Sequence, residues 1–124
     1  MHTRLWAAQI VVGLFFIVVG VLHLVVPDNL PGQLEWMYDL SENLHYLTGV
    51  AEILGGLGLI LPGLTRRWTW LTPLAATGLI LLMAGAIVWH LGREEFTNVA
   101  TNVILVLALS FIAYGRWRAH PLPQ

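Results

Sequence analysis

One carboxylate and three histidines, all set in apolar sequence, are the residues of this chain best suited to chemistry. Glu52 lies in the run GVAEILGGLGLILP, residues 49–62, which holds no other charged side chain. His23, His45 and His90 each lie near the end of an apolar run. Carboxyl and imidazole groups both take up and release protons, and an ionisable group within apolar sequence usually has a function. These residue types therefore favour proton transfer or hydrogen bonding to a polar ligand.

The elements that must position these side chains are membrane-spanning helices. The chain is 57% hydrophobic and 10% charged, whereas soluble domains carry about 25% charged residues. Four apolar runs predict spans at about 5–26, 44–61, 68–91 and 97–115, close to the roughly 20 residues that cross a bilayer. We expect an all-α fold in which residues 1–124 form one integral membrane domain, a four-transmembrane-helix bundle. The first run has no small-x-small cleavage site, so we expect it to be a retained span.

The arginines predict the orientation of this bundle. With four spans, five of the six arginines fall on one face together with both chain ends, and the positive-inside rule places that face in the cytoplasm. Six of the seven acidic residues fall on the opposite, outer face. The five arginines are Arg4, Arg66, Arg67, Arg116 and Arg118, with Arg93 outside, and the six acids are Asp28, Glu35, Asp39, Glu42, Glu94 and Glu95.

The longest loop, residues 27–43, lies on the outer face in this topology. Its Leu34, Met37 and Leu40 recur at helical spacing, which indicates a short helix on the membrane surface. Asp39 or Ser41 could cap the second span.

The predicted topology gathers polar groups in the outer half of the bundle. Glu52 lies seven residues after His45, about 10 Å deeper along the helix. We expect Glu52 to lie inside the bundle, within hydrogen-bonding distance or one water of a polar partner on the third or fourth span. Its cavity should open to the outer side, with His45 lining the mouth. The candidate ligand-binding residues are Glu52, His90, Asn98, Asn102, His45 and His23, whereas the inner half holds only the isolated Gln9, Thr72, Thr77 and Ser110.

The second span has a face on which glycine alternates with polar residues. Small residues on such a face let helix backbones approach closely within a membrane. A carboxyl on this face points into the bundle, and burial favours its protonated form. Each polar residue also has a structural alternative, as a hydrogen-bond hub, an interfacial anchor or a link between helices. The face contains His45, Thr48, Gly49, Glu52 and Gly56, at spacings of three, four and seven.

Several short motifs resemble the DoxX and DoxX-like family of small four-helix membrane proteins. They are GVAEILGGLGLILP at 49–62 with the double arginine that follows, MAGAIVWH at 83–90, the pair Asn98 and Asn102, and AYGR ending at Arg116. The resemblance implies a four-helix protein linked to redox systems, since relatives include a subunit of a thiosulfate:quinone oxidoreductase and factors of oxidative stress or assembly. It also implies that Glu52, His90, Asn98 and Asn102 line an internal site. We expect the protein in a bacterial or archaeal cytoplasmic membrane.

Three functions are compatible with these features. The first is an accessory subunit of a redox-associated complex whose outer pocket binds a quinone or similar lipid. The second is a quinol-linked oxidoreductase subunit in which Glu52 and a histidine relay protons. The third is a membrane chaperone or assembly factor whose polar cluster is only structural. Haem is favoured less than quinone, and the histidine spacing predicts no metal site. We expect contact with the bilayer, a protein partner or second copy, and no nucleic acid.

Overall fold

A computed structural model describes all 124 residues and contains four long helices and no strand. All four helices are long and apolar enough to cross a membrane, so the predicted all-α four-helix fold is confirmed. A 3₁₀ helix lies in the first loop, and a π-helical turn continues the last helix. The elements are α1 (His2–Val25), η1 (Gly32–Asp39), α2 (Glu42–Thr65), α3 (Leu71–Gly92), α4 (Phe96–Tyr114) and η2 (Gly115–Ala119).

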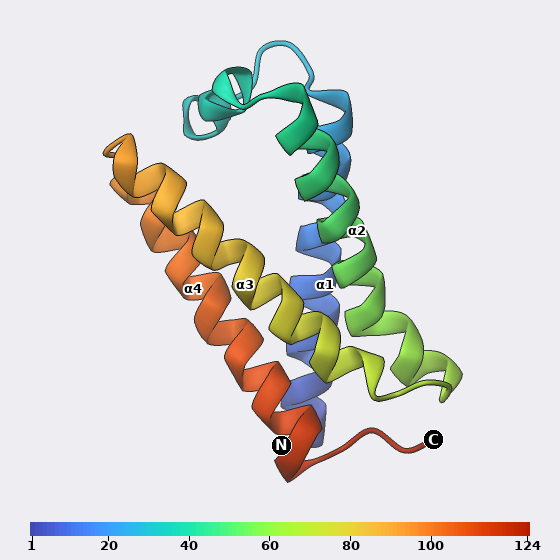
Figure 1. Cartoon of the computed structure of the whole chain (residues 1–124). Coiled ribbons are helices and arrows are strands. Elements are labelled where there is room, and N and C mark those ends of the chain that lie inside the picture. Colours follow the sequence, from blue (N-terminus) through green and yellow to red (C-terminus); the bar gives the residue numbers. More distant parts are fainter.

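The helices are arranged as two antiparallel pairs rather than as an evenly packed bundle. Helix α1 packs chiefly on α2, and α3 packs chiefly on α4, while contacts between the pairs are fewer. The pairs meet near the two chain termini and diverge toward η1 (Figure 1). The divergence leaves room for a cavity in one half of the molecule only.

Glycines hold the first pair together. A Cβ atom on Gly56 would lie 2.6 Å from the carbonyl oxygen of Gly13, and one on Gly49 would lie 2.8 Å from that of Gly20. Both positions are too close for any side chain, so the two backbones touch at two points seven residues apart on each helix. This contact confirms the packing face predicted for the second span, because His45, Glu52, Gly49 and Gly56 are all buried on α2.

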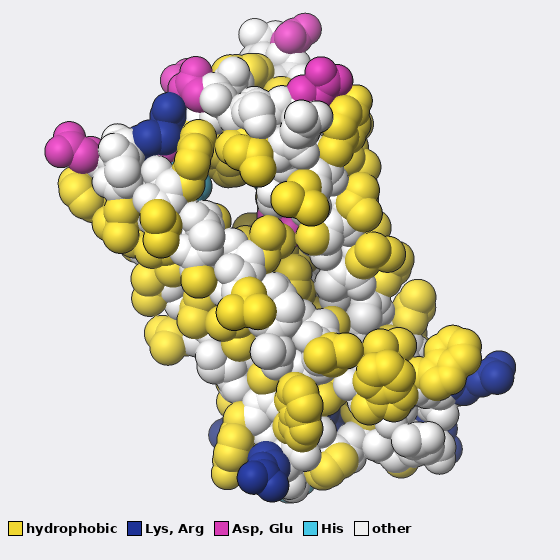
Figure 2. Space-filling view, in the orientation of Figure 1, with side chains coloured by type: hydrophobic (Ala, Val, Ile, Leu, Met, Phe, Trp, Pro, Cys, Tyr) yellow, Lys and Arg dark blue, Asp and Glu magenta, His cyan; other side chains and the backbone are white.

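The two ends of the molecule differ in charge. The end that holds both termini carries most of the arginine side chains, and the end that holds η1 carries most of the visible Asp and Glu side chains (Figure 2). We call these the arginine-rich end and the acidic end. This is the predicted distribution, with Arg93 at the acidic end, where it binds Asp39. That the arginine-rich end faces the cytoplasm stays a prediction.

The half nearest the arginine-rich end is closed by a packed core and a buried polar network. Phe16, Leu59 and Leu109 are almost completely buried there. Arg116 Nε donates to Gln9 Oε1 at 2.5 Å, and Gln9 Nε2 donates to the carbonyl of Leu59 at 2.7 Å. The prediction that Gln9 is isolated was therefore wrong, because η2 turns Arg116 back onto α1.

The first loop folds over the acidic end. The predicted short helix is η1, and Ser41 caps α2, since its hydroxyl accepts a hydrogen bond from the amide of Leu44. Met37 is only 1% exposed, so η1 packs on the bundle rather than lying apart on the membrane surface. On the opposite side, Arg93 Nη2 donates to Asp39 Oδ2 at 2.6 Å. The loop thus connects the diverging helix pairs.

Candidate functional site

A cavity of about 520 Å³ lies between the two helix pairs in the acidic half of the molecule. Figure 2 shows the opening of this cavity between the two helix pairs, below the loop that contains η1. Most of its wall is apolar, as the long apolar faces of α1 to α4 dictate. Five of the six candidate residues line it, namely His23, Glu52, His90, Asn98 and Asn102. Their role in binding a ligand stays a prediction.

Glu52 lies inside the bundle and is 3% exposed. Its nearest recorded polar neighbour is His23, whose Nε2 lies 3.7 Å from Glu52 Oε1. We expected Glu52 to lie within hydrogen-bonding distance or one water of a polar partner on the third or fourth span. No direct hydrogen bond from Glu52 to α3 or α4 is recorded, and a contact through one water stays a prediction. The reason is the divergence of the helix pairs, which sets Asn102 and His90 in the wall of the cavity that Glu52 also lines.

His45 does not line this cavity, contrary to expectation. Its Nδ1 lies 2.8 Å from Nδ1 of His23, and its Nε2 lies 2.6 Å from the carbonyl oxygen of Met37. His45 therefore lies behind His23, between α1 and η1, and borders a second cavity of about 350 Å³. The helical spacing placed it correctly on the face of Glu52, but the glycine contact brings α1 so close that His23 lies between His45 and the main cavity.

His90 belongs to a second polar group, which joins the cavity wall to the covering loop. Its Nδ1 donates to Glu95 Oε1 at 3.0 Å, and Arg93 Nε donates to the same oxygen at 2.9 Å. Burial alone would raise the pKa of Glu95, but the hydrogen bonds from Arg93 and His90 and their charges lower it overall. The hydrogen bonds with Glu95 and Asp39 raise the pKa of Arg93, so both groups stay charged.

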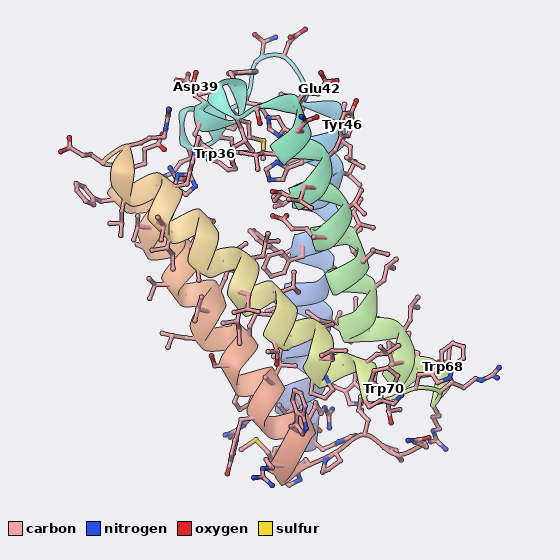
Figure 3. The ribbon with its side chains drawn as sticks, viewed as in Figure 1. Trp36, Asp39, Glu42, Tyr46, Trp68 and Trp70 are labelled. Atoms are coloured by element: carbon pink, nitrogen blue, oxygen red, sulfur yellow. The ribbon has the colours of Figure 1, made fainter.

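Two tryptophans, Trp36 and Trp89, also line the cavity. The ring of Trp36 lies 4.9 Å from that of His90, 5.8 Å from that of Trp89 and 5.6 Å from that of His23. Figure 3 shows Trp36 beneath η1, at the gap between the helix pairs. For Trp89, the adjacent His90 was an available signal. For Trp36, nothing in the sequence indicated a place in the cavity wall beyond the helical spacing of the loop that contains it.

Three buried polar atoms around the cavity have no hydrogen-bond partner in the protein. They are the indole Nε1 of Trp36, Oε2 of Glu52 and Nδ2 of Asn102. A buried polar group without a partner costs about 1–3 kcal/mol, and most such groups in folded proteins are satisfied. The three residues that carry these atoms, two N–H donors and one carboxyl oxygen, all line the cavity.

The chemistry available here is hydrogen bonding and proton exchange. No group of three or more His, Asp or Glu side chains is placed to hold a metal ion. The recorded ring contacts of His23 and His90 are with other protein side chains, so these rings act within hydrogen-bonding groups.

A family model described as the DoxX-like family matches residues 7–113. The matched region contains all four helices almost completely and every candidate residue of the site. No curated protein and no solved structure matches the chain.

Proposed function

Because the chain belongs to the DoxX-like family, we propose that it is a ligand-binding accessory subunit of a redox-associated membrane complex. Its ligand is a lipid-like molecule with a small polar head that accepts hydrogen bonds, and a quinone fits best. Four membrane-spanning helices bring the protein into contact with the bilayer, where quinones dissolve.

One observation carries this proposal, namely that the three unpartnered polar atoms belong to residues that all line the same cavity. A quinone head has two carbonyl oxygens. These oxygens accept hydrogen bonds, as the indole of Trp36 and the amide of Asn102 require, while a protonated Glu52 supplies a further donor. A polar cluster with only a structural role would be expected to satisfy its own groups. The observation thus favours a ligand over the structural role of an assembly factor or chaperone.

The rest of the cavity suits an apolar tail. Its wall includes Phe15, Val19, Leu47 and Leu82, and its volume lies within the roughly 300–1,000 Å³ of small-molecule sites. Gly85 is exposed and lines the cavity, so it lies where the cavity opens to the surface. Since α3 is a membrane-spanning helix, a tail that leaves beside Gly85 enters lipid.

A fluorescence titration tests this proposal. The probe is a benzoquinone with a short prenyl tail, added to purified protein in detergent, and Trp36 and Trp89 serve as reporters in the cavity wall. We expect saturable quenching by the quinone and none by the prenyl alcohol of the same tail. Gly85→Leu should abolish this quenching, because the new side chain narrows the opening.

The matched control is Gly78→Leu, on the same helix and outside this cavity. A Cβ at Gly78 or at Gly85 meets nothing within 4 Å, so both positions have open space where the new side chain begins. Gly78→Leu should bind like the wild type. Equal binding by Gly85→Leu and the wild type, or equal quenching by the prenyl alcohol, would contradict the proposal.

A further inference from the structure

A chain of contacts leads from Glu52, in the wall of the cavity, through His23 and His45. It runs from Glu52 Oε1 to His23 Nε2 at 3.7 Å, from His23 Nδ1 to His45 Nδ1 at 2.8 Å, and from His45 Nε2 to the carbonyl oxygen of Met37 at 2.6 Å. His23, His45 and Glu52 are 2%, 6% and 3% exposed. Buried in this way, the three groups can exchange protons readily only along the chain.

The carbonyl at the end of the chain fixes the direction of the last hydrogen bond. A carbonyl oxygen only accepts, so His45 Nε2 must carry a hydrogen. The short contact between the two Nδ1 atoms needs one hydrogen, supplied by either ring. Once the Glu52 carboxyl moves within hydrogen-bonding distance of His23 Nε2, that contact also holds one hydrogen. The three links therefore hold three protons, one of which can reside on Glu52, on His23 or on His45.

We propose that Glu52, His23 and His45 form a proton path between the ligand cavity and the acidic end of the molecule. At one end, Glu52 lines the cavity, and its Oε2 has no hydrogen-bond partner in the protein. At the other end, His45 borders the second cavity, whose other lining groups include Tyr38, Glu42 and Tyr46. Figure 3 shows Glu42 and Tyr46 at the start of α2, at the acidic end.

The rings of the path separate the two cavities. Only His23 and Leu40 line both of them, so a proton that passes between the cavities meets the His23 ring. The titratable groups that face the path are Tyr38 on η1, Glu42 and Tyr46 on α2, and His90 on α3. Helix α4 contributes amide and hydroxyl groups, chiefly Asn98 and Asn102.

Each step of the transfer conserves protons. The O–H bond of Glu52 breaks as an N–H bond forms at His23 Nε2, and the proton on His23 Nδ1 moves to His45 Nδ1. His45 then releases its Nε2 proton to a water molecule in the second cavity. Uptake of a proton at the same nitrogen reverses the steps and restores the bond to Met37. The first step needs the Glu52 carboxyl to move by about 1 Å, since hydrogen bonds span about 2.7–3.2 Å.

This path rests on the proposed function and adds the chemical class of the ligand to it. The head group is one that gains or loses a proton at an oxygen beside Glu52, such as a quinol or another phenol. A ligand whose head cannot titrate would have no use for the path. The histidine chain itself rests on distances between protein atoms and does not depend on the identity of the ligand.

The decisive variant is His45→Gln. A glutamine amide can donate to the carbonyl of Met37 and accept from His23 Nδ1, so it can keep both hydrogen bonds of His45 but cannot relay a proton. The measurement is hydrogen–deuterium exchange of the Glu52 carboxyl, followed by infrared spectroscopy and assigned by the band that Glu52→Gln removes. We expect His45→Gln to slow this exchange by about a hundredfold, the lower end of what a positioned acid–base group contributes.

A second measurement distinguishes a structural role of the two histidines from a role in proton transfer. Nitrogen NMR of ring-labelled histidine should show a hydrogen on Nε2 of His45 and a coupling across the hydrogen bond between the two Nδ1 atoms. Exchange that is equally fast in His45→Gln, with its melting temperature unchanged, would overturn the path, and so would the absence of the coupling. Quinone binding to His45→Gln should equal that of the wild type, because His45 lies outside the ligand cavity. Failure of the wild type to bind quinone would instead count against the proposed function alone.

Discussion

Glu95 is the residue at which the cavity wall and the covering loop meet. It accepts hydrogen bonds from His90 and from Arg93, and Arg93 also binds Asp39 of η1. Its pKa is lowered below the ordinary value of about 4.3, despite a burial effect in the opposite direction. A carboxyl whose pKa is lowered by folding stabilises the fold fully above its unfolded pKa, and this stabilisation is lost as the pH falls through the folded value.

We therefore expect acid to loosen η1. As the pH falls through the lowered pKa of Glu95, protonation of this carboxyl releases Arg93 and His90, and emission from Trp36 should change because its ring lies against His90. The step should be small and should shrink at high salt, because the ion pair is partly exposed. Glu95→Gln should lack this step, whereas the neighbouring Glu94→Gln, which removes no recorded ion pair, should keep it. An unchanged step in Glu95→Gln would contradict this assignment.

Individual site residues differed in how well the sequence revealed them. Glu52, His90, Asn98 and Asn102 were predictable because intramembrane polar groups must point into the bundle. His45 was placed on the correct face but assigned to the wrong cavity, since its position depends on His23, 22 residues away in sequence. Trp36 was missed, because an interfacial tryptophan and a cavity tryptophan look the same until the loop is placed.

Among the elements, the α1–α2 pair depends on glycine more directly than any other contact. In Gly56→Ala the new methyl group would lie 2.6 Å from the carbonyl of Gly13, so the helices must separate. We expect a loss of about 1–3 kcal/mol in unfolding free energy, as for other overpacked contacts. Unfolding of purified protein by a denaturing detergent, followed by circular dichroism, measures this loss.

Gly78→Ala is the matched control for this substitution. A Cβ at Gly78 meets nothing within 4 Å, and alanine is favoured over glycine in a helix by about 0.5–1 kcal/mol. This variant should be as stable as the wild type or more so. Equal losses in the two variants would mean that the glycine contact does not hold the pair together.

The presence of the helix η1 could be predicted from the sequence, but its position over the cavity could not. The spacing of Leu34, Met37 and Leu40 indicated a helix in the loop, and the structure contains one. Its position over the cavity is set by two contacts that spacing does not encode. One joins His45 to the Met37 carbonyl, and the other joins Asp39 to Arg93, 54 residues away.

For the whole molecule, apolar length and the exclusion of backbone polar groups from lipid made four helices predictable. The division into two diverging pairs was not predictable, because all four helices have similar apolar faces. The division follows from the Gly13–Gly56 and Gly20–Gly49 contacts, which pack α1 closely against α2. The cavity is the consequence, since helices held close in one pair cannot also fill the space between the pairs.

The orientation of the whole molecule is open to a direct test, because the chain contains no cysteine. Gly32→Cys places a single thiol at the acidic end, where a Cβ meets nothing within 4 Å, and Gln124→Cys places one at the arginine-rich end. Five of the six arginines lie at the latter end, so the positive-inside rule predicts that it faces the cytoplasm. A membrane-impermeant maleimide should label Gly32→Cys in intact cells and Gln124→Cys only after permeabilisation. Both should react equally once solubilised. The opposite labelling pattern would leave the fold unchanged but would open the proton path to the cytoplasm.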